Sequence, residues 1–232
     1  MGEARAAAVD PSRIRWSVDP DRLAQELDGK RLLIVLHGYG SNAEDLFSLV
    51  PYLPDDFVVA AVEGLEPTQM GGWAWFPITV DPGTGELQRK SDDVEAATRS
   101  LLDWIAQLDA QLTPALGGEV QISLLGFSQG GAMSIELLRH APERFDSAVV
   151  LAGFVIPHVS AESAVRDAAL AAVRPRVFWG RDPRDPVISA SMVDLTRRWL
   201  PEHTDLDART YANGGHSISL DELEDVASFL RQ

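Results

Sequence analysis

Apolar residues occur along the chain in short continuous runs, separated by longer segments with helical spacing. A short continuous apolar run is typical of a strand that is buried on both faces of a parallel sheet. Two further segments, Arg13–Val18 and Leu206–Tyr211, are more polar and resemble strands with an exposed side. The continuous runs are Arg31–His37, Phe57–Val62, Val120–Leu125, Ala148–Ala152 and Arg176–Trp179.

Helical patterns fill most of the chain between these runs. From Ser91 onward, apolar residues recur at helical spacing until Pro114, which we expect to end the helix. The spacing predicts further helices over Gln129–His140 and over Ala190–Leu200, the latter ended by Pro201. Ser219, Asp221 and Glu222 are typical of a helix start. That last helix has an apolar side formed by Leu220, Leu223, Val226, Ala227 and Leu230.

Alternating strands and helices predict an α/β fold with a mostly parallel central sheet and helices on both faces. The 232 residues suit one domain, which we place at 13–232, preceded by a flexible tail over 1–12. Sheets of this kind carry their active sites at the carboxyl ends of the strands. We therefore expect the reactive residues to lie in the loops that follow the strands.

The segment Gly64–Gly85 has no clear periodicity and is rich in glycine, proline and aromatic residues. One interpretation is a loop packed on the core. The other is a wall or lid of a binding pocket, in which Trp73, Trp75 and Phe76 contact a substrate. These aromatic residues could equally form an interface, so a homodimer stays open.

Composition excludes several classes of protein. A formal net charge of −15 leaves no basic surface for nucleic acid or for a polybasic membrane anchor. The absence of cysteine removes thiolate metal sites and disulfides, and it fits a reducing compartment. No signal peptide or membrane-spanning run is visible, so we expect a cytoplasmic protein. Neither an H-E-x-x-H pair nor another metal motif is present, and we expect no metal and no cofactor.

The most specific motif is Gly126-Phe127-Ser128-Gln129-Gly130, a G-x-S-x-G sequence between a predicted strand and a predicted helix. A sharp strand-to-helix turn exposes the Ser128 hydroxyl at the helix N-terminus, where negative charge is favoured. The glycines permit close backbone packing around this turn. Ser128 is therefore the candidate nucleophile.

A serine nucleophile needs a base, and the base needs an orienting acid. His216 lies in a glycine-rich loop after the last strand, which makes it the best candidate among five histidines. Asp182 and Asp185 both follow the strand before it, and spacing alone does not separate them. The backbone N–H of Gln129, together with that of Tyr39 in the loop after the first buried strand, is the candidate oxyanion hole. His37 then braces this loop.

Four motifs in order resemble the phospholipase/carboxylesterase family of α/β-hydrolases, which includes acyl-protein thioesterases and small bacterial carboxylesterases. They are LHGYG at 36–40, GFSQGG at 126–131, DPVI at 185–188 and GGHS at 214–217. The resemblance spans about residues 30–230 and implies an α/β-hydrolase fold without a large cap domain. It favours Asp185 over Asp182, although Ser189 stands where the family has proline. It also supports Tyr39 and Gln129 as the oxyanion pair.

We therefore expect a serine carboxylesterase that hydrolyses small esters through an acyl-enzyme, using Ser128, Asp185 and His216. A small-molecule ester is the expected partner. An acyl-thioesterase or lysophospholipase with the same three residues is an alternative. A ligand-binding protein that kept the fold without activity is another, and labelling by a fluorophosphonate would distinguish it.

Overall fold

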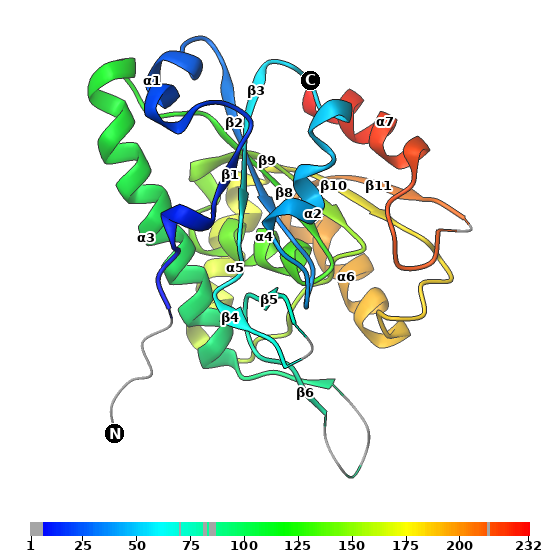
Figure 1. The fold of residues 1–232 in the computed structure, drawn as a ribbon. Coiled ribbons are helices and arrows are strands. Elements are labelled where there is room, and N and C mark those ends of the chain that lie inside the picture. The colour runs from blue at the N-terminus through cyan, green and yellow to red at the C-terminus, as the bar shows by residue number, and fades with distance from the viewer. Residues whose placement is uncertain (1–6, 70, 81–82, 84–86, 213) are drawn as a thin grey trace.

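The computed structural model describes residues 7–69, 71–80, 83, 87–212 and 214–232 (Figure 1). In this part of the chain, a seven-stranded sheet has the order β1-β3-β2-β8-β9-β10-β11. Only β1 runs antiparallel to its neighbour, so the predicted mostly parallel sheet is confirmed. The strands are β1 (Arg15–Trp16), β2 (Arg31–Leu36), β3 (Phe57–Val62), β8 (Ile122–Phe127), β9 (Phe145–Leu151), β10 (Arg176–Arg181) and β11 (Asp205–Thr210).

The register of the parallel strands aligns their carboxyl ends. Leu36 at the end of β2 lies opposite Gly126 of β8, and Phe127 lies opposite Leu151 at the end of β9. On the other side of β9, β10 and β11 end together, with Arg181 opposite Thr210. The loops that follow these strands therefore emerge side by side at one edge of the sheet, as expected for an open α/β sheet.

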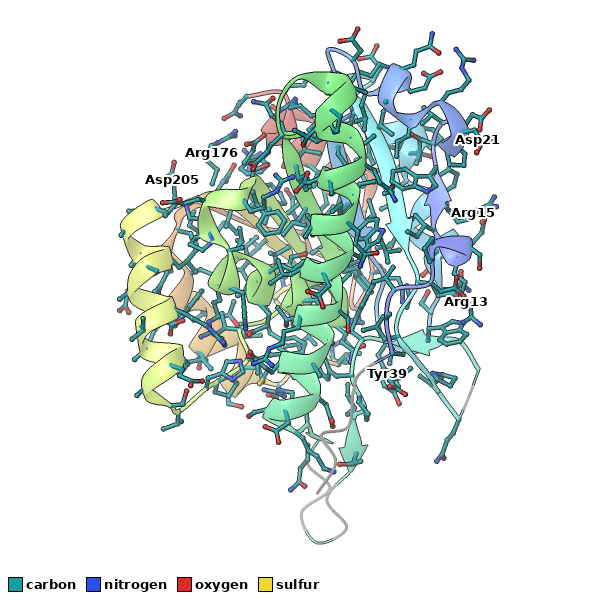
Figure 2. The ribbon with its side chains drawn as sticks, turned by 90° about the vertical axis from the view of Figure 1, so that its left-hand side faces the viewer. Arg13, Arg15, Asp21, Tyr39, Arg176 and Asp205 are labelled. Carbon is teal, nitrogen blue, oxygen red and sulfur yellow. The ribbon has the colours of Figure 1, made fainter. Side chains whose placement is uncertain are left out.

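Helices cover both faces of the sheet, and the alternation of strand side chains decides which face each one packs against. Side chains such as Leu32, Ile34 and Leu124 pack with α1, α3, α4, α5 and α6, whereas Leu33 and Leu125 face α2 and α7. Figure 2 shows α3 running along the first face. The helices are α1 (Leu23–Glu26), α2 (Ala43–Phe47), α3 (Ser91–Leu116), α4 (Gln129–His140), α5 (Ala161–Val173), α6 (Ala190–His203) and α7 (Leu220–Leu230).

Two predicted helix ends are wrong. Helix α3 continues through Pro114 to Leu116 and is followed by Gly117, which has a left-handed φ of 72°. Helix α6 continues through Pro201. A proline in the last turn removes one hydrogen bond to the carbonyl four residues earlier. Those carbonyls belong to the exposed residues Ala110 and Arg197, where water can replace the lost donor.

The apolar side of α7 also begins later than predicted, because Leu220 is 61% exposed. Ser219 caps the helix, and its side chain and that of Glu222 form a reciprocal capping box. The buried side of the helix starts with Glu222 and Leu223. In the part of the chain that the structure describes, every helix is too short or too polar to cross a lipid bilayer.

The aromatic segment forms two small hairpins between β3 and α3. Strand β4 (Glu66–Pro67) pairs with β5 (Trp73–Ala74), and β6 (Thr79–Val80) pairs with β7 (Leu87–Gln88). Residues 70, 81–82 and 84–86 lie outside the described part of the chain, as do residues 1–6 of the expected tail. In the remainder of that tail, Val9 is buried against the core and Pro11–Arg13 forms a short 3-10 helix.

Candidate active site

Ser128 occupies a strained turn between β8 and α4. Its φ of 55° and ψ of −115° lie outside the regions that side-chain-bearing residues favour. The Ser128 N–H donates to the Leu151 carbonyl at 2.8 Å, and its carbonyl accepts from the Ala132 N–H at 3.0 Å. These two hydrogen bonds hold the turn from the sheet side and from the helix side.

The glycines of the motif allow this turn to pack against the sheet. A Cβ atom added at Gly130 would overlap the carbonyl of Leu36, and one added at Gly126 would overlap the carbonyl of Gly130. Backbone therefore lies directly against backbone at both positions. This contact fixes the start of α4 against the end of β2 and explains why the motif requires glycine on each side of Ser128.

Ser128, His216 and Asp185 form a continuous row of hydrogen bonds. The Ser128 hydroxyl lies 2.9 Å from His216 Nε2, and His216 Nδ1 lies 2.7 Å from Asp185 Oδ2. With the ring neutral, Nδ1–H donates to the carboxylate and leaves the Nε2 lone pair to accept from the hydroxyl. The Asp185 side chain is 1% exposed, whereas that of His216 is 17% exposed. The Asp185 carboxylate is thus buried, and the His216 ring is more exposed than the carboxylate that it contacts.

The two aspartates that follow β10 have different contacts. Asp185 contacts the imidazole with one carboxylate oxygen, and its other oxygen accepts from the N–H of Val187 at 2.8 Å. Asp182 instead accepts from two backbone donors, the N–H groups of Arg184 at 2.7 Å and Gly215 at 2.8 Å. These donors hold the pKa of Asp182 below its ordinary value. The structure thus brings Asp185, and not Asp182, to the His216 ring.

His37 is buried and braces the loop after β2, as expected. Its Nδ1–H donates to the Gly38 carbonyl at 2.7 Å, and its Nε2 accepts from the Gly64 N–H at 2.9 Å. Burial lowers the pKa of His37 below its ordinary value, although the contact with the Gly38 carbonyl opposes this shift. A neutral ring is also required for Nε2 to accept a hydrogen bond.

The loop that His37 braces lies directly beside Ser128. A Cβ atom added at Gly38 would lie 3.5 Å from the Cβ of Ser128. The Gly38 carbonyl accepts a hydrogen bond from the His37 ring. The Tyr39 N–H belongs to the same trans peptide as this carbonyl, so it points away from the His37 ring. Gln129 begins α4, and its backbone N–H is one of the free donors at the helix N-terminus. The phenol of Tyr39 projects to the surface (Figure 2).

The three aromatic residues predicted to contact a substrate occupy two environments. Trp75 and Phe76 are each 1% exposed, so their side chains belong to the core beneath the site. Trp73 is half-buried, with the guanidinium carbon of Arg13 lying 3.9 Å from its ring centre. The contact of these three residues with a substrate stays a prediction.

Gln129 has a second contact that the sequence does not reveal. Its Oε1 accepts from the Trp75 N–H at 3.0 Å, and its Nε2 donates to the Phe76 carbonyl at 2.8 Å. The Trp75 indole N–H donates to the His37 carbonyl at 2.8 Å. The aromatic segment is therefore tied to both candidate oxyanion loops. A polar residue directly after Ser128 was the only sequence signal for this link.

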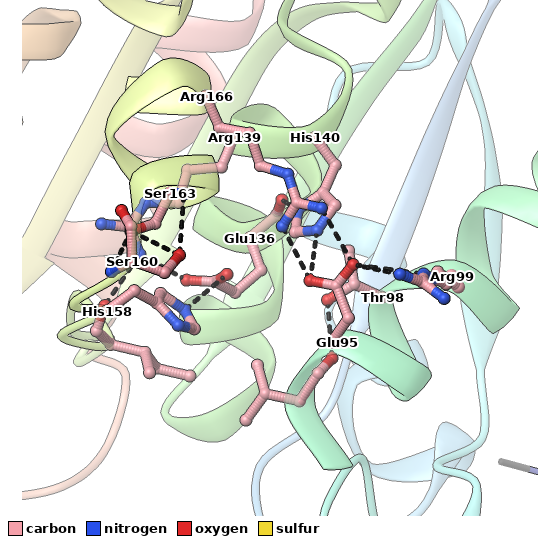
Figure 3. Close-up of polar contacts among 12 residues, drawn as sticks. Glu95, Thr98, Arg99, Glu136, Arg139, His140, His158, Ser160, Ser163 and Arg166 are labelled. Carbon is pink, nitrogen blue, oxygen red and sulfur yellow. Dashed lines mark hydrogen bonds and ion pairs between the residues drawn. The ribbon is translucent and has the colours of Figure 1, made fainter. Parts of the chain in front are cut away.

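The remaining histidines lie away from Ser128. Figure 3 shows two of them in a polar cluster between α3, α4 and α5, where His140 Nε2 contacts Glu95 at 2.9 Å and His158 Nε2 contacts Glu136 at 3.0 Å. His203 ends α6, with its ring stacked on Trp199. All five histidines are described, and His216 is the one hydrogen-bonded to Ser128. The described residues contain no group of three or more ligand side chains placed to hold a metal ion.

The parallel sheet, the strained serine turn and the adjacent histidine and aspartate are features of a hydrolase with the α/β-hydrolase fold. The family model for Phospholipase/Carboxylesterase matches residues 23–232. The chain belongs to this family of esterase- and thioesterase-type hydrolases, and the resemblance read from its motifs is confirmed.

The proteins that this chain resembles carry the names of thioesterases and of esterases. Acyl-protein thioesterase 1 of Saccharomyces cerevisiae is 26% identical over 223 residues, which cover 88% of this chain and 92% of the yeast protein. The structure of esterase PE8 is 25% identical, with a TM-score of 0.70, covering 88% of this chain and 92% of that one. A carboxylesterase from Mesorhizobium loti has a TM-score of 0.73 at 19% identity, covers 97% and 99% of the two chains, and shows the shared fold.

Proposed function

We propose that this protein is a serine carboxylesterase that hydrolyses small carboxylic esters through an acyl-enzyme intermediate. Ser128 is the nucleophile, His216 the general base and Asp185 the orienting acid. The observation that carries the proposal is the unbroken row of hydrogen bonds from Asp185 through His216 to the Ser128 hydroxyl. A serine hydroxyl becomes an effective nucleophile when a positioned base removes its proton.

The acylation step begins when Ser128 Oγ attacks the ester carbonyl carbon while His216 Nε2 takes the hydroxyl proton. The carbonyl oxygen becomes an oxyanion, which the N–H groups of Tyr39 and Gln129 stabilise. Collapse of this intermediate breaks the bond to the alcohol oxygen, and the imidazolium returns its proton to the departing alcohol. Asp185 stabilises the imidazolium and keeps Nδ1 protonated.

Deacylation repeats these events with water in place of the serine hydroxyl. His216 removes a proton from the water as its oxygen attacks the acyl carbon, and the same two N–H groups bind the second oxyanion. Collapse of this second intermediate releases the carboxylic acid and returns the proton to Ser128. Loss of one oxyanion donor typically costs about 10²–10³ in kcat, so the two amides and the base carry most of the catalysis.

A thioester hydrolase is the second candidate function, because the relative from yeast is named an acyl-protein thioesterase. A thioester differs in its leaving group, and the same attack and the same oxyanion contacts would cleave it. Matched acyl chains on an oxygen ester and on a thioester distinguish the two functions. A kcat/KM at least about tenfold higher for the oxygen ester supports the carboxylesterase assignment, because a tenfold ratio corresponds to about 1.4 kcal/mol.

The first test compares hydrolysis of short p-nitrophenyl esters by the wild-type protein and by Ser128→Ala. We expect the variant to lose at least about 10³-fold in kcat, as when a nucleophile is removed from a catalytic triad. Ser228→Ala, which changes an exposed serine on α7, is the control and should retain wild-type activity. Covalent labelling by a fluorophosphonate should require Ser128. Equal rates for wild type and Ser128→Ala would exclude the proposed mechanism.

A further inference from the structure

Asp182 connects the loop that carries the candidate acid to the loop that carries the candidate base. Its side chain is buried, and Oδ2 accepts from the N–H of Gly215, the residue directly before His216, at 2.8 Å. Its backbone carbonyl accepts from the Asp185 N–H at 3.2 Å. One residue therefore contacts the backbone of Asp185 on one side and the backbone beside His216 on the other.

Among the described residues, the loop that carries His216 is anchored at both of its ends. It leaves β11 where the Tyr211 N–H donates to the Arg181 carbonyl at 2.9 Å, and it ends at Ser219, the cap of α7. Gly215 has a left-handed φ of 63°, a conformation that glycine adopts without strain. Between these ends, the Asp182 carboxylate accepts from the Gly215 N–H. This hydrogen bond holds the loop next to His216 against the loop that carries Asp185.

Both oxygens of Asp182 are engaged by backbone donors, so this carboxylate does not compete with Asp185 for the imidazole. The second donor, the N–H of Arg184, lies in the same turn as Asp185. Hydrogen bonds from two backbone N–H groups favour the ionised carboxylate and hold its pKa below the ordinary value. Asp182 thus remains charged across the pH range in which a histidine base works.

We propose that Asp182 is a positioning residue, which sets the contact between Asp185 and His216 by holding their two loops in register. The proposal rests on the function proposed above for Ser128, Asp185 and His216. Proton transfer is sensitive to small displacements, and a shift of about 1 Å can cost about 10²-fold in rate. Without the Asp182 carboxylate, the Gly215 N–H loses its partner and the imidazole is free to move relative to both Asp185 and Ser128.

The test is a double-mutant cycle on kcat and KM for a short p-nitrophenyl ester. Asp182→Ala should lower kcat by about 10–100-fold and change KM by less than about twofold, because the lost interaction orients the base. Asp182→Asn keeps one acceptor oxygen but turns its NH₂ group toward the other donor, so we expect a smaller loss. Asp185→Asn should lower kcat by about 10³–10⁴-fold.

The cycle separates positioning from general structural support. In the Asp185→Asn background, adding Asp182→Ala should lower kcat by less than about threefold, because Asp182 acts through the Asp185–His216 contact. The full 10–100-fold loss in both backgrounds would overturn the proposal. Asp221→Ala removes an acidic charge five residues after His216 and is the matched control, expected to keep wild-type kcat.

Folding is checked by circular dichroism and by the thermal midpoint, and kcat is counted per active site titrated with a fluorophosphonate. If Asp182→Ala does not fold, Asp182→Asn takes its place in the cycle. Wild-type kcat in both Asp182 variants, with Asp185→Asn inactive, would overturn this inference and leave the proposed function standing. Wild-type kcat in Asp185→Asn would instead overturn the proposed function.

Discussion

The side-chain amide of Gln129 holds the backbone of Trp75, with Oε1 accepting from the Trp75 N–H at 3.0 Å. Gln129 is also the first residue of α4 and follows the candidate nucleophile directly. The other end of the amide donates to the Phe76 carbonyl at 2.8 Å. One side chain therefore fixes a buried aromatic segment to the turn that presents Ser128.

Replacing Gln129 with methionine should destabilise the protein by about 2–6 kcal/mol. The buried N–H of Trp75 and the carbonyl of Phe76 would lose their partners, and each unsatisfied group costs about 1–3 kcal/mol. Urea unfolding measures the change, with Gln107→Met on the exposed side of α3 as control. We also expect a lower kcat, because the turn loses a support. An unfolding midpoint equal to that of the control would contradict this account of Gln129.

Gly130→Ala should be strongly destabilising. Its Cβ would overlap the Leu36 carbonyl, so α4 must move away from β2 and carry Ser128 with it. Overpacking of this kind costs about 1–3 kcal/mol or more. Gly118→Ala is the control, because a Cβ there meets no atom within 4 Å. Thermal unfolding of the two variants should differ by several degrees, and similar midpoints would show that the backbone contact is unimportant.

Glu222→Gln should remove the part of the pH dependence of the free energy of unfolding that comes from Glu222. Glu222 is buried with one oxygen lacking a hydrogen-bond partner among the described residues, and burial raises its pKa from 4.5 to about 7. Between pH 4.5 and 7 the unfolded carboxyl ionises while the folded one stays protonated, so the wild-type protein loses stability as pH rises through this window. The loss amounts to roughly 3 kcal/mol.

The corresponding measurement is urea unfolding of wild type and Glu222→Gln at several pH values. Glutamine keeps an oxygen for the Ser219 N–H and carries no charge, so the variant should be the more stable protein above pH 7. The two stabilities should converge toward pH 4.5. A difference that stays constant with pH would show that the titration of Glu222 is not coupled to folding.

Glu95 should make the stability depend on pH in the opposite direction to Glu222. Burial opposes its ionisation, but hydrogen bonds from Arg166 and His140 outweigh this effect and hold its pKa at about 2 (Figure 3). The stability that ionised Glu95 contributes is therefore complete above pH 4.5 and is lost as pH falls toward 2. The side chain is 24% exposed, so screening reduces the expected effect to about 1–2 kcal/mol.

Acid unfolding of Glu95→Gln tests this expectation. The variant should be less stable than wild type at pH 6 and should approach it below pH 3. Glu224→Gln, at an exposed position of α7, is the control and should follow the wild-type curve. An acid transition in Glu95→Gln identical to that of wild type would contradict the role of this cluster.

Local patterns were sufficient to predict the sheet and to single out Ser128 as the candidate nucleophile. The run Phe57–Val62 became β3 with the predicted bounds, because a fully apolar strand has few places to lie except inside a sheet. Helix α5 was not predicted, since its outward face carries alanine and valine and gives no clear amphipathic signal. The ends at Pro114 and Pro201 were wrong because a helix tolerates proline where the affected carbonyl reaches water.

The sequence by itself determined the fold class and the order of the candidate residues, since buried strands and the glycine-flanked serine are local patterns with few alternatives. Spacing alone did not separate Asp182 from Asp185 and the family resemblance favoured Asp185, but only the tertiary structure shows which carboxylate contacts His216. Asp182 and Asp185 leave the same strand three residues apart, and their directions depend on donors from a loop about thirty residues away. The burial of Trp75 and Phe76 was decided in the same way, by the amide of Gln129 and the carbonyl of His37.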